Sequence, residues 1–149
     1  LFSSQTIFYF MLGPSAAQSV RFFSLEFFNN MVDQLNADDS LAKVTKGMNT
    51  SLLLSCAELS AFHIIDIKEG RLSLRQASSN QIAEFAFSAP YSEWEKIARG
   101  QAKIPGEVIS GRIKFKGSMP KMLLHLNKVL GLESKVMKAI NSMNLDFNP

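Results

Sequence analysis

Residues 111–117 read GRIKFKG, an unbroken alternation of basic and apolar residues between two glycines. A period of two predicts a β-strand with one polar face and one apolar face. Ile113 and Phe115 are therefore expected to face the protein interior. The other face carries the cations Arg112, Lys114 and Lys116. These cations could contact a phosphate or an anionic head group, but the alternation favours an ordinary solvated strand face.

The same strand gives no indication of a nucleic-acid partner. Single-stranded nucleic acids bind where exposed aromatic rings lie beside cations, whereas Phe115 lies on the face opposite Lys114 and Lys116. The chain has a formal net charge of only +3, from 16 basic and 13 acidic residues that are mixed along the sequence. Dedicated nucleic-acid binders cluster their basic residues, so we expect no nucleic acid among the partners.

Length and composition favour one globular domain. The chain has 149 residues, of which 46% are hydrophobic and 12 are Phe, enough to bury one substantial core. Cys56 is the only cysteine, so neither an internal disulfide nor a thiolate metal site can form. A reducing compartment fits this cysteine usage, and we predict a cytoplasmic location.

Hydrophobic periodicity predicts a helix followed by several strands. The helix is expected to run from its N-cap Ser24 to Leu35, and Val20 and Phe23 could extend it backwards. Strands are expected at residues 50–58, 61–68, 71–77 and 82–88. Two of these flank the Glu69-Gly70 turn and should form a hairpin.

The rest of the chain predicts three more helices. One covers residues 91–99, a second begins at Ser118 and ends at Gly131, and the last covers 132–143. Because GRIKFKG adds one strand between the first two of them, the order predicts an α+β fold with a sheet of mainly antiparallel strands.

No set of residues in this sequence points to catalysis or to a metal. The histidines, His63 and His125, lie on different expected elements, and no pair of acids marks a general acid and base. Cys56 follows an apolar run, which favours a buried and unreactive thiol. We therefore expect neither an enzyme nor a cofactor.

Methionines accumulate in the two C-terminal helices, at positions 119, 122, 137 and 143. Methionine adapts its shape to irregular apolar surfaces. The pattern fits ordinary core packing, and it also fits a cavity between sheet and helices that holds a long apolar ligand.

From Trp94 to Leu130 the sequence resembles the sterol carrier protein type 2 family. The resemblance rests on Trp94, on a helix that ends at Gly100, and on GRIKFKGSMPKMLLHLNKVL at 111–130, where a basic strand between two glycines precedes an apolar helix. It extends back to SLEFF at 24–28 and LNAD at 35–38, and covers about residues 22–144. This resemblance concerns the fold, because the matching residues include no catalytic group.

The resemblance implies a five-stranded, mostly antiparallel sheet covered on one face by helices and enclosing a hydrophobic tunnel. It implies a soluble intracellular protein that binds or transfers fatty acids, acyl-CoA, sterols or similar lipids. Residues 132–143 would then close the tunnel mouth. The expected lining residues are Phe85, Phe87, Trp94, Ile97, Phe115, Met122, Leu123, Leu126, Val136, Met137 and Ile140, with Arg112, Lys114 and Lys116 as possible head-group contacts.

The expected organisation is an N-terminal extension at 1–21, the lipid-binding domain at 22–144 and a tail at 145–149. A monomer or weak dimer that contacts membranes transiently would suit a lipid carrier. A second hypothesis is a non-catalytic accessory module of a complex that metabolises lipids or quinones, or a domain of a larger enzyme. In that case residues 1–21 would serve as a docking segment or a domain junction.

Overall fold

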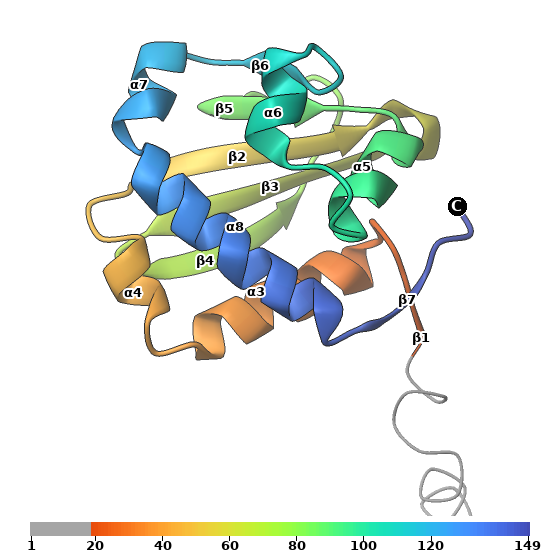
Figure 1. Ribbon diagram of the computed structural model, residues 1–149, viewed down its shortest axis with the longest axis horizontal. Coiled ribbons are helices and arrows are strands. Elements are labelled where there is room, and N and C mark those ends of the chain that lie inside the picture. Colours follow the sequence, from red (N-terminus) through yellow and green to blue (C-terminus); the bar gives the residue numbers. More distant parts are fainter. Residues whose placement is uncertain (1–18) are drawn as a thin grey trace, which may run out of the picture.

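The computed structural model describes residues 19–149, and residues 1–18, which make up most of the predicted N-terminal extension, lie outside the described residues. In Figure 1 the helices gather on one face of a five-stranded sheet, and the last long helix crosses that face. The α+β architecture predicted from the sequence is thus confirmed.

All five predicted strands are present in the large sheet. They are β2 (Thr50–Cys56), β3 (Ala61–Lys68), β4 (Arg71–Gln76), β5 (Phe85–Ser88) and β6 (Lys114–Lys116). Their spatial order is β4-β3-β2-β5-β6. Each neighbouring pair is antiparallel except β2 and β5, which run parallel. The prediction of a mostly antiparallel sheet is therefore confirmed.

Side-chain alternation gives this sheet an inner face and an outer face. On the inner face, Leu52 of β2 lies between Ile65 of β3 and Phe85 of β5 in the strand register. Its sequence neighbour Leu53 pairs with Ile64 on the outer face. The inner row joins the main hydrophobic core, whereas Leu53 and Ile64 are buried apart from it.

The helices are α3 (Leu25–Ala37), α4 (Leu41–Val44), α5 (Tyr91–Ala98), α6 (Ile104–Ile109), α7 (Met119–Leu124) and α8 (Leu126–Asn141), with a short 3₁₀ turn at Ala57–Leu59. Ser24 caps α3 as predicted, because its Oγ accepts a hydrogen bond of 3.1 Å from the backbone N–H of Phe27. At the other end of α3, the side chain of Asn36 pairs with both backbone groups of Leu72, at 2.8 and 2.9 Å, and so fixes the helix to β4.

The prediction that a helix ends at Gly131 is wrong. The break between the last two helices falls at His125, and Gly131 lies inside α8. Gly131 is not among the glycines with a positive φ, unlike Gly100 just after α5, whose φ is 74°. A Cβ at position 131 would lie 3.1 Å from Cγ1 of Val44. Glycine at this position therefore allows α8 to pack closely on α4, and it does not end a helix.

The backward extension of α3 is also wrong. Residues Ser19–Arg21 form strand β1, which pairs in parallel with β7 (Asn144–Asp146) as a separate two-stranded sheet. Phe23 has a φ of 65°, a left-handed conformation that cannot continue a helix. Strand β1 lies within the predicted extension, whereas β7 begins at the last residue of the predicted domain and continues into the predicted tail. The division into extension, domain and tail stays a prediction.

Candidate ligand-binding cavity

A cavity of about 160 Å³ lies between the inner face of the sheet and the helices. The sheet supplies an apolar floor formed by Leu52, Leu54, Ile65, Leu72, Phe85 and Phe87. These residues share one face because they alternate along their strands and meet in register across β4, β3, β2 and β5. The cavity floor therefore follows directly from the strand pattern.

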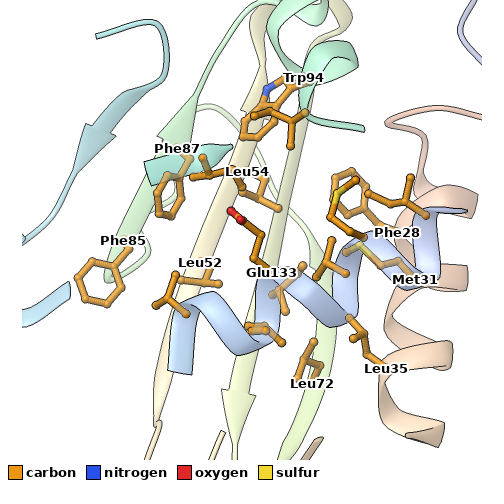
Figure 2. Close-up of a pocket in the computed structure, with 18 of the residues that line it drawn as sticks. Phe28, Met31, Leu35, Leu52, Leu54, Leu72, Phe85, Phe87, Trp94 and Glu133 are labelled. Carbon is orange, nitrogen blue, oxygen red and sulfur yellow. The ribbon is translucent and has the colours of Figure 1, made fainter. Parts of the chain in front are cut away.

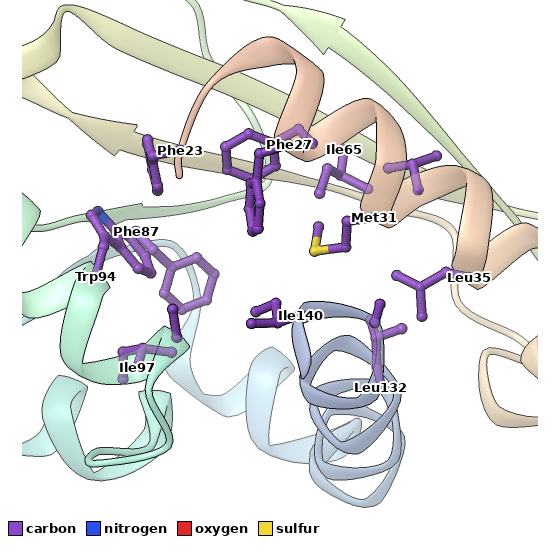
Figure 3. Packing of buried hydrophobic residues seen from close by; sticks show 14 of the residues in the cluster. Phe23, Phe27, Met31, Leu35, Ile65, Phe87, Trp94, Ile97, Leu132 and Ile140 are labelled. Atoms are coloured by element: carbon purple, nitrogen blue, oxygen red, sulfur yellow. The ribbon is translucent and has the colours of Figure 1, made fainter. Parts of the chain in front are cut away.

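Two helices form the walls of this cavity. From α3, the residues Phe27, Phe28, Met31 and Leu35 line it. From α8, the residues Val129, Leu132, Glu133, Val136, Met137 and Ile140 line it, at the three- and four-residue spacing of a single helix face. Figure 3 shows Met31 and Leu35 on α3 and, across from them, Leu132 and Ile140 on α8.

Helix α5 closes one end of the cavity and is tied to β2. Trp94 and Ile97 contribute to the lining. The indole Nε1–H of Trp94 donates a buried hydrogen bond of 2.9 Å to the carbonyl oxygen of Ser55. At the start of α5, the backbone N–H of Tyr91 donates to the carboxylate of Glu58 at 2.5 Å. The Trp94 ring is thus held in a fixed position against the sheet.

The cavity volume of about 160 Å³ is close to that of an apolar cavity that holds one benzene molecule, roughly 150 Å³. Pockets for drug-sized ligands measure roughly 300–1,000 Å³. A long lipid chain therefore needs more space than this conformation offers. The predicted continuous tunnel stays a prediction.

Most of the chain also matches a known protein family. Residues 28–131 match the SCP-2 sterol transfer family. The chain belongs to this family. Membership implies lipid binding or transfer as the broad function, and the predicted resemblance is confirmed. No curated protein sequence matches the chain significantly.

Solved structures share the fold of this SCP-2 domain at low sequence identity. A crystal structure of sterol carrier protein 2 is 14% identical with a TM-score of 0.69, and the match covers 83% of this chain and 99% of that one. A Thermus thermophilus protein described as possibly a sterol carrier protein is also 14% identical, with a TM-score of 0.66 and coverages of 86% and 93%. The UbiJ-SCP2 ubiquinone synthesis protein is 15% identical, with a TM-score of 0.52 and coverages of 74% and 85%.

Most of the predicted lining residues of the SCP-2 domain do surround the cavity. They are Phe85, Phe87, Trp94, Ile97, Met122, Val136, Met137 and Ile140. Their shared position is a fact of the fold, whereas contact with a lipid stays a prediction.

Three predicted lining residues lie elsewhere in the structure. Phe115 packs beside the floor, with its ring centroid 6.0 Å from that of Phe85 and 5.3 Å from that of Phe87, but it does not border the cavity. Leu123 and Leu126 are 57% and 39% exposed. They point outward because the chain changes direction at His125, so that Met122 and His125 face inward instead.

The residues of α3 that line the cavity were not among the predicted lining residues. An apolar helical face has the same periodicity in a packed core and in a cavity wall, so no sequence signal separated the two. Glu133 was also missed. It had a signal, because it is an acidic residue on the otherwise apolar face of α8 that continues through Val136, Met137 and Ile140.

The cations of GRIKFKG lie outside the cavity. Arg112 forms a bidentate ion pair with Glu107, at 2.5 and 2.9 Å. The Arg112 guanidinium lowers the pKa of Glu107 to about 2. Lys114 and Lys116 are exposed on the face opposite Phe115, as predicted. Their contact with a lipid head group stays a prediction.

Two residues that were considered for a chemical role, His63 and Cys56, are buried. His63 packs against the ring of Phe28 at a centroid distance of 4.3 Å, and burial lowers its pKa. Cys56 is fully buried, and burial raises the pKa of its thiol. Residues 19–149 contain no cluster of three or more His, Cys, Asp or Glu side chains suited to a metal ion. None of the helices formed by these residues has the length and hydrophobicity needed to cross a membrane.

Proposed function

We propose that this SCP-2 domain is a non-catalytic carrier that holds the apolar part of a lipid between its sheet and helix α8. The observation that supports this most is the cavity itself, whose lining is apolar except for Thr50, His125 and Glu133. Burying a methylene group stabilises a complex by about 0.8 kcal/mol. A long chain can thus be held without many specific polar contacts.

Movement of α8 is the simplest source of the additional space. Its polar contacts lie on the side of α3 and α4, where Lys135 Nζ meets Asp38 Oδ2 at 2.7 Å. Lys128 also donates to the carbonyl oxygen of Lys46 in the loop after α4. Within the described part of the chain, no hydrogen bond or ion pair joins α8 to the five-stranded sheet. The sheet-facing side of α8 can therefore separate from the floor without breaking polar contacts.

The outward side of α7 and the start of α8 suits contact with a membrane during loading and release. Leu124 is 82% exposed and Leu130 is 45% exposed, and both lie on the helices that carry the inward-facing Met122 and Val129. Exposed apolar clusters of this kind mark interaction surfaces. Replacing Leu123 and Leu124 by Ser should slow lipid transfer between vesicles and leave lipid affinity unchanged. An unchanged transfer rate would refute the membrane contact.

Candidate ligands are fatty acids, acyl-CoA, sterols and similar lipids. The exposed Lys114 and Lys116 could contact the phosphates of acyl-CoA at the edge of the sheet. Replacing both by Glu should then weaken acyl-CoA binding and leave free fatty acid binding unchanged. Equal effects on both ligands, or no effect, would assign these lysines to an ordinary solvated face.

The carrier proposal is tested by native mass spectrometry of the purified full chain, together with titration of a pyrene-labelled fatty acid and a pyrene-labelled alkane. We expect co-purified lipid, or saturable binding of at least one probe at micromolar concentration. Absence of both would refute the proposal.

An accessory role is the second candidate, because the same fold occurs in a ubiquinone synthesis protein. In that role residues 1–18 would dock the domain onto a partner. Removal of residues 1–18 keeps the β1–β7 pairing intact, whereas removal of 1–21 would destroy it. If the shortened chain binds lipid normally but no longer co-purifies with a complex that the full chain joins, the accessory role is supported. The carrier role alone predicts no such loss.

A further inference from the structure

Glu133 interrupts the apolar face that α8 presents to the sheet. Its neighbours on this face are Val129, Leu132, Val136 and Met137, which all line the cavity. Figure 2 shows the Glu133 carboxyl group pointing from α8 toward the strands, near Leu52 and Leu54. A helix that served only as packing would carry an apolar residue at this position.

The carboxyl group has no partner of its own inside the cavity. Its Oε2 atom is buried, and no group among residues 19–149 donates a hydrogen bond to it. The lysines of α8 with assigned contacts point elsewhere, Lys128 to the Lys46 carbonyl and Lys135 to Asp38. Burying an unpaired polar oxygen costs free energy. Because Oε2 is closed off in the empty protein, a ligand can reach this carboxyl group only when α8 separates from the floor. The cost of the unpaired oxygen at the cavity wall then indicates that the missing partner is the ligand.

We propose that Glu133 accepts a hydrogen bond from the polar end of the bound lipid, and that this end carries a hydrogen-bond donor, a hydroxyl group or an amine. This inference rests on the proposed lipid-binding function and assigns the orientation of the ligand. The polar end enters the cavity beside α8, and the apolar chain lies along Phe85, Phe87 and Leu54 of the floor.

The same geometry disfavours an ionised fatty acid in that orientation. Two carboxylates within hydrogen-bonding distance repel each other and offer no donor. The other polar lining groups, on Thr50 and His125, come from the start of β2 and from the α7–α8 junction rather than from the middle of α8. A fatty acid would therefore keep its carboxylate away from Glu133 and lose the contact that an alcohol gains.

The test is competition between ligands that share one chain length. The competing ligands are hexadecanol, hexadecylamine, hexadecyl methyl ether and palmitate. Each is titrated against an uncharged pyrene-labelled alkane bound to the full chain, to Glu133→Gln or to Glu133→Leu. A hydrogen bond to a carboxylate corresponds to about tenfold or more in affinity. We expect hexadecanol or hexadecylamine to bind about tenfold tighter than the methyl ether, and this preference to disappear in Glu133→Leu. The order of alcohol and amine distinguishes the two donors.

Equal affinities for alcohol, amine and ether in the unmodified protein would overturn the inference while the carrier proposal stands, and so would palmitate binding tighter than all three. Failure of every ligand and of the pyrene-labelled alkane to bind would instead refute the carrier proposal.

A second readout does not depend on any ligand. Because the unpaired carboxyl group destabilises the empty protein, Glu133→Leu should raise the midpoint of thermal unfolding by a few degrees. The matched change Ser134→Leu, at the exposed neighbouring position of α8, should not. An unchanged or lower midpoint for Glu133→Leu would mean that Glu133 is satisfied in the empty protein, which would overturn the inference.

Discussion

Trp94 and Tyr91 show how one polar atom decides the effect of a substitution. Both rings are buried on α5, but the indole N–H of Trp94 has the Ser55 carbonyl as its partner, whereas the Tyr91 hydroxyl has none among the described residues. Trp94→Phe removes this buried hydrogen bond, although the Ser55 carbonyl keeps the Ala89 N–H as a second donor at 3.2 Å. The substitution should lower the free energy of unfolding by about 1 kcal/mol or more. Chemical denaturation measures this change.

Tyr91→Phe is the matched control. It removes a buried hydroxyl that lacks a partner, so the free energy of unfolding should stay constant or rise slightly. A loss as large as that of Trp94→Phe would show that Tyr91 has a polar partner, and the contrast between the two rings would then be wrong.

At this scale the sequence predicts most of the lining residues in strands and helices alike, although Phe115, Leu123 and Leu126 do not border the cavity. Phe85 and Phe87 could be assigned to the cavity because alternation fixes the face of every strand residue. Leu123 and Leu126 could not, because the face of a helical residue depends on where the helix starts and stops. The change of direction at His125 follows from tertiary packing, for which a single sequence carries no local signal.

At the scale of elements, the contact between α4 and α8 depends on Gly131. Alanine is favoured over glycine inside a helix by about 1 kcal/mol, but its Cβ would lie 3.1 Å from Cγ1 of Val44. We expect Gly131→Ala to stabilise the protein clearly only when Val44→Ala is also present. A double-mutant cycle of unfolding free energies measures the coupling. Equal effects of Gly131→Ala in both backgrounds would contradict the close approach.

The ion pair between Glu107 and Arg112 connects α6 to the segment before β6 and makes stability depend on pH. Because Arg112 lowers the pKa of Glu107 from 4.5 to about 2, the pair stabilises the fold above pH 4.5, and this contribution disappears as the pH falls toward 2. Burial raises the pKa of the neighbouring Glu93. Glu93 therefore has the opposite pH dependence, because it contributes to stability at low pH and this contribution is lost as the pH rises through the raised pKa.

The measurement is the free energy of unfolding of the unmodified protein and of Glu107→Gln between pH 6 and pH 2.5. The unmodified protein should lose more stability over the acidic part of this range than Glu107→Gln. Glu95→Gln, which removes a more exposed ion pair with Arg99 on the surface of α5, serves as the control and should follow the unmodified protein. Parallel curves for all three proteins would contradict the assignment.

The strands of the large sheet were predictable as elements because each carries its own alternating pattern and turn residues. The pair β1–β7 was not, since each strand has only three residues and the partners lie at opposite ends of the described chain. Aromatic packing supports this pair, with the rings of Phe22 and Phe147 5.2 Å apart and the Arg99 guanidinium 4.1 Å from the Phe147 ring centroid. Such contacts depend on the complete fold.

At the scale of the whole molecule, a five-stranded sheet faces a helix whose polar contacts lie along one side only. Pairing of β7 with β1 anchors the chain just after α8, and the contacts with α3 and α4 hold the helix laterally. Because the empty cavity of about 160 Å³ is smaller than a long lipid, the carrier proposal predicts that the distance between α8 and the floor increases on binding. In this proposal α8 is the adjustable wall of the cavity and the sheet is the fixed wall.

The most direct test of this account fills the space between α8 and the sheet. Val136→Trp places a large ring in the cavity, whereas Ser134→Trp places the same ring on the exposed face of the same helix. Titration with the pyrene-labelled alkane, on variants whose circular dichroism confirms folding, should show binding lost or weakened at least about tenfold in Val136→Trp and unchanged in Ser134→Trp. Equal affinity in the two folded variants would contradict the claim that the lipid lies between α8 and the sheet.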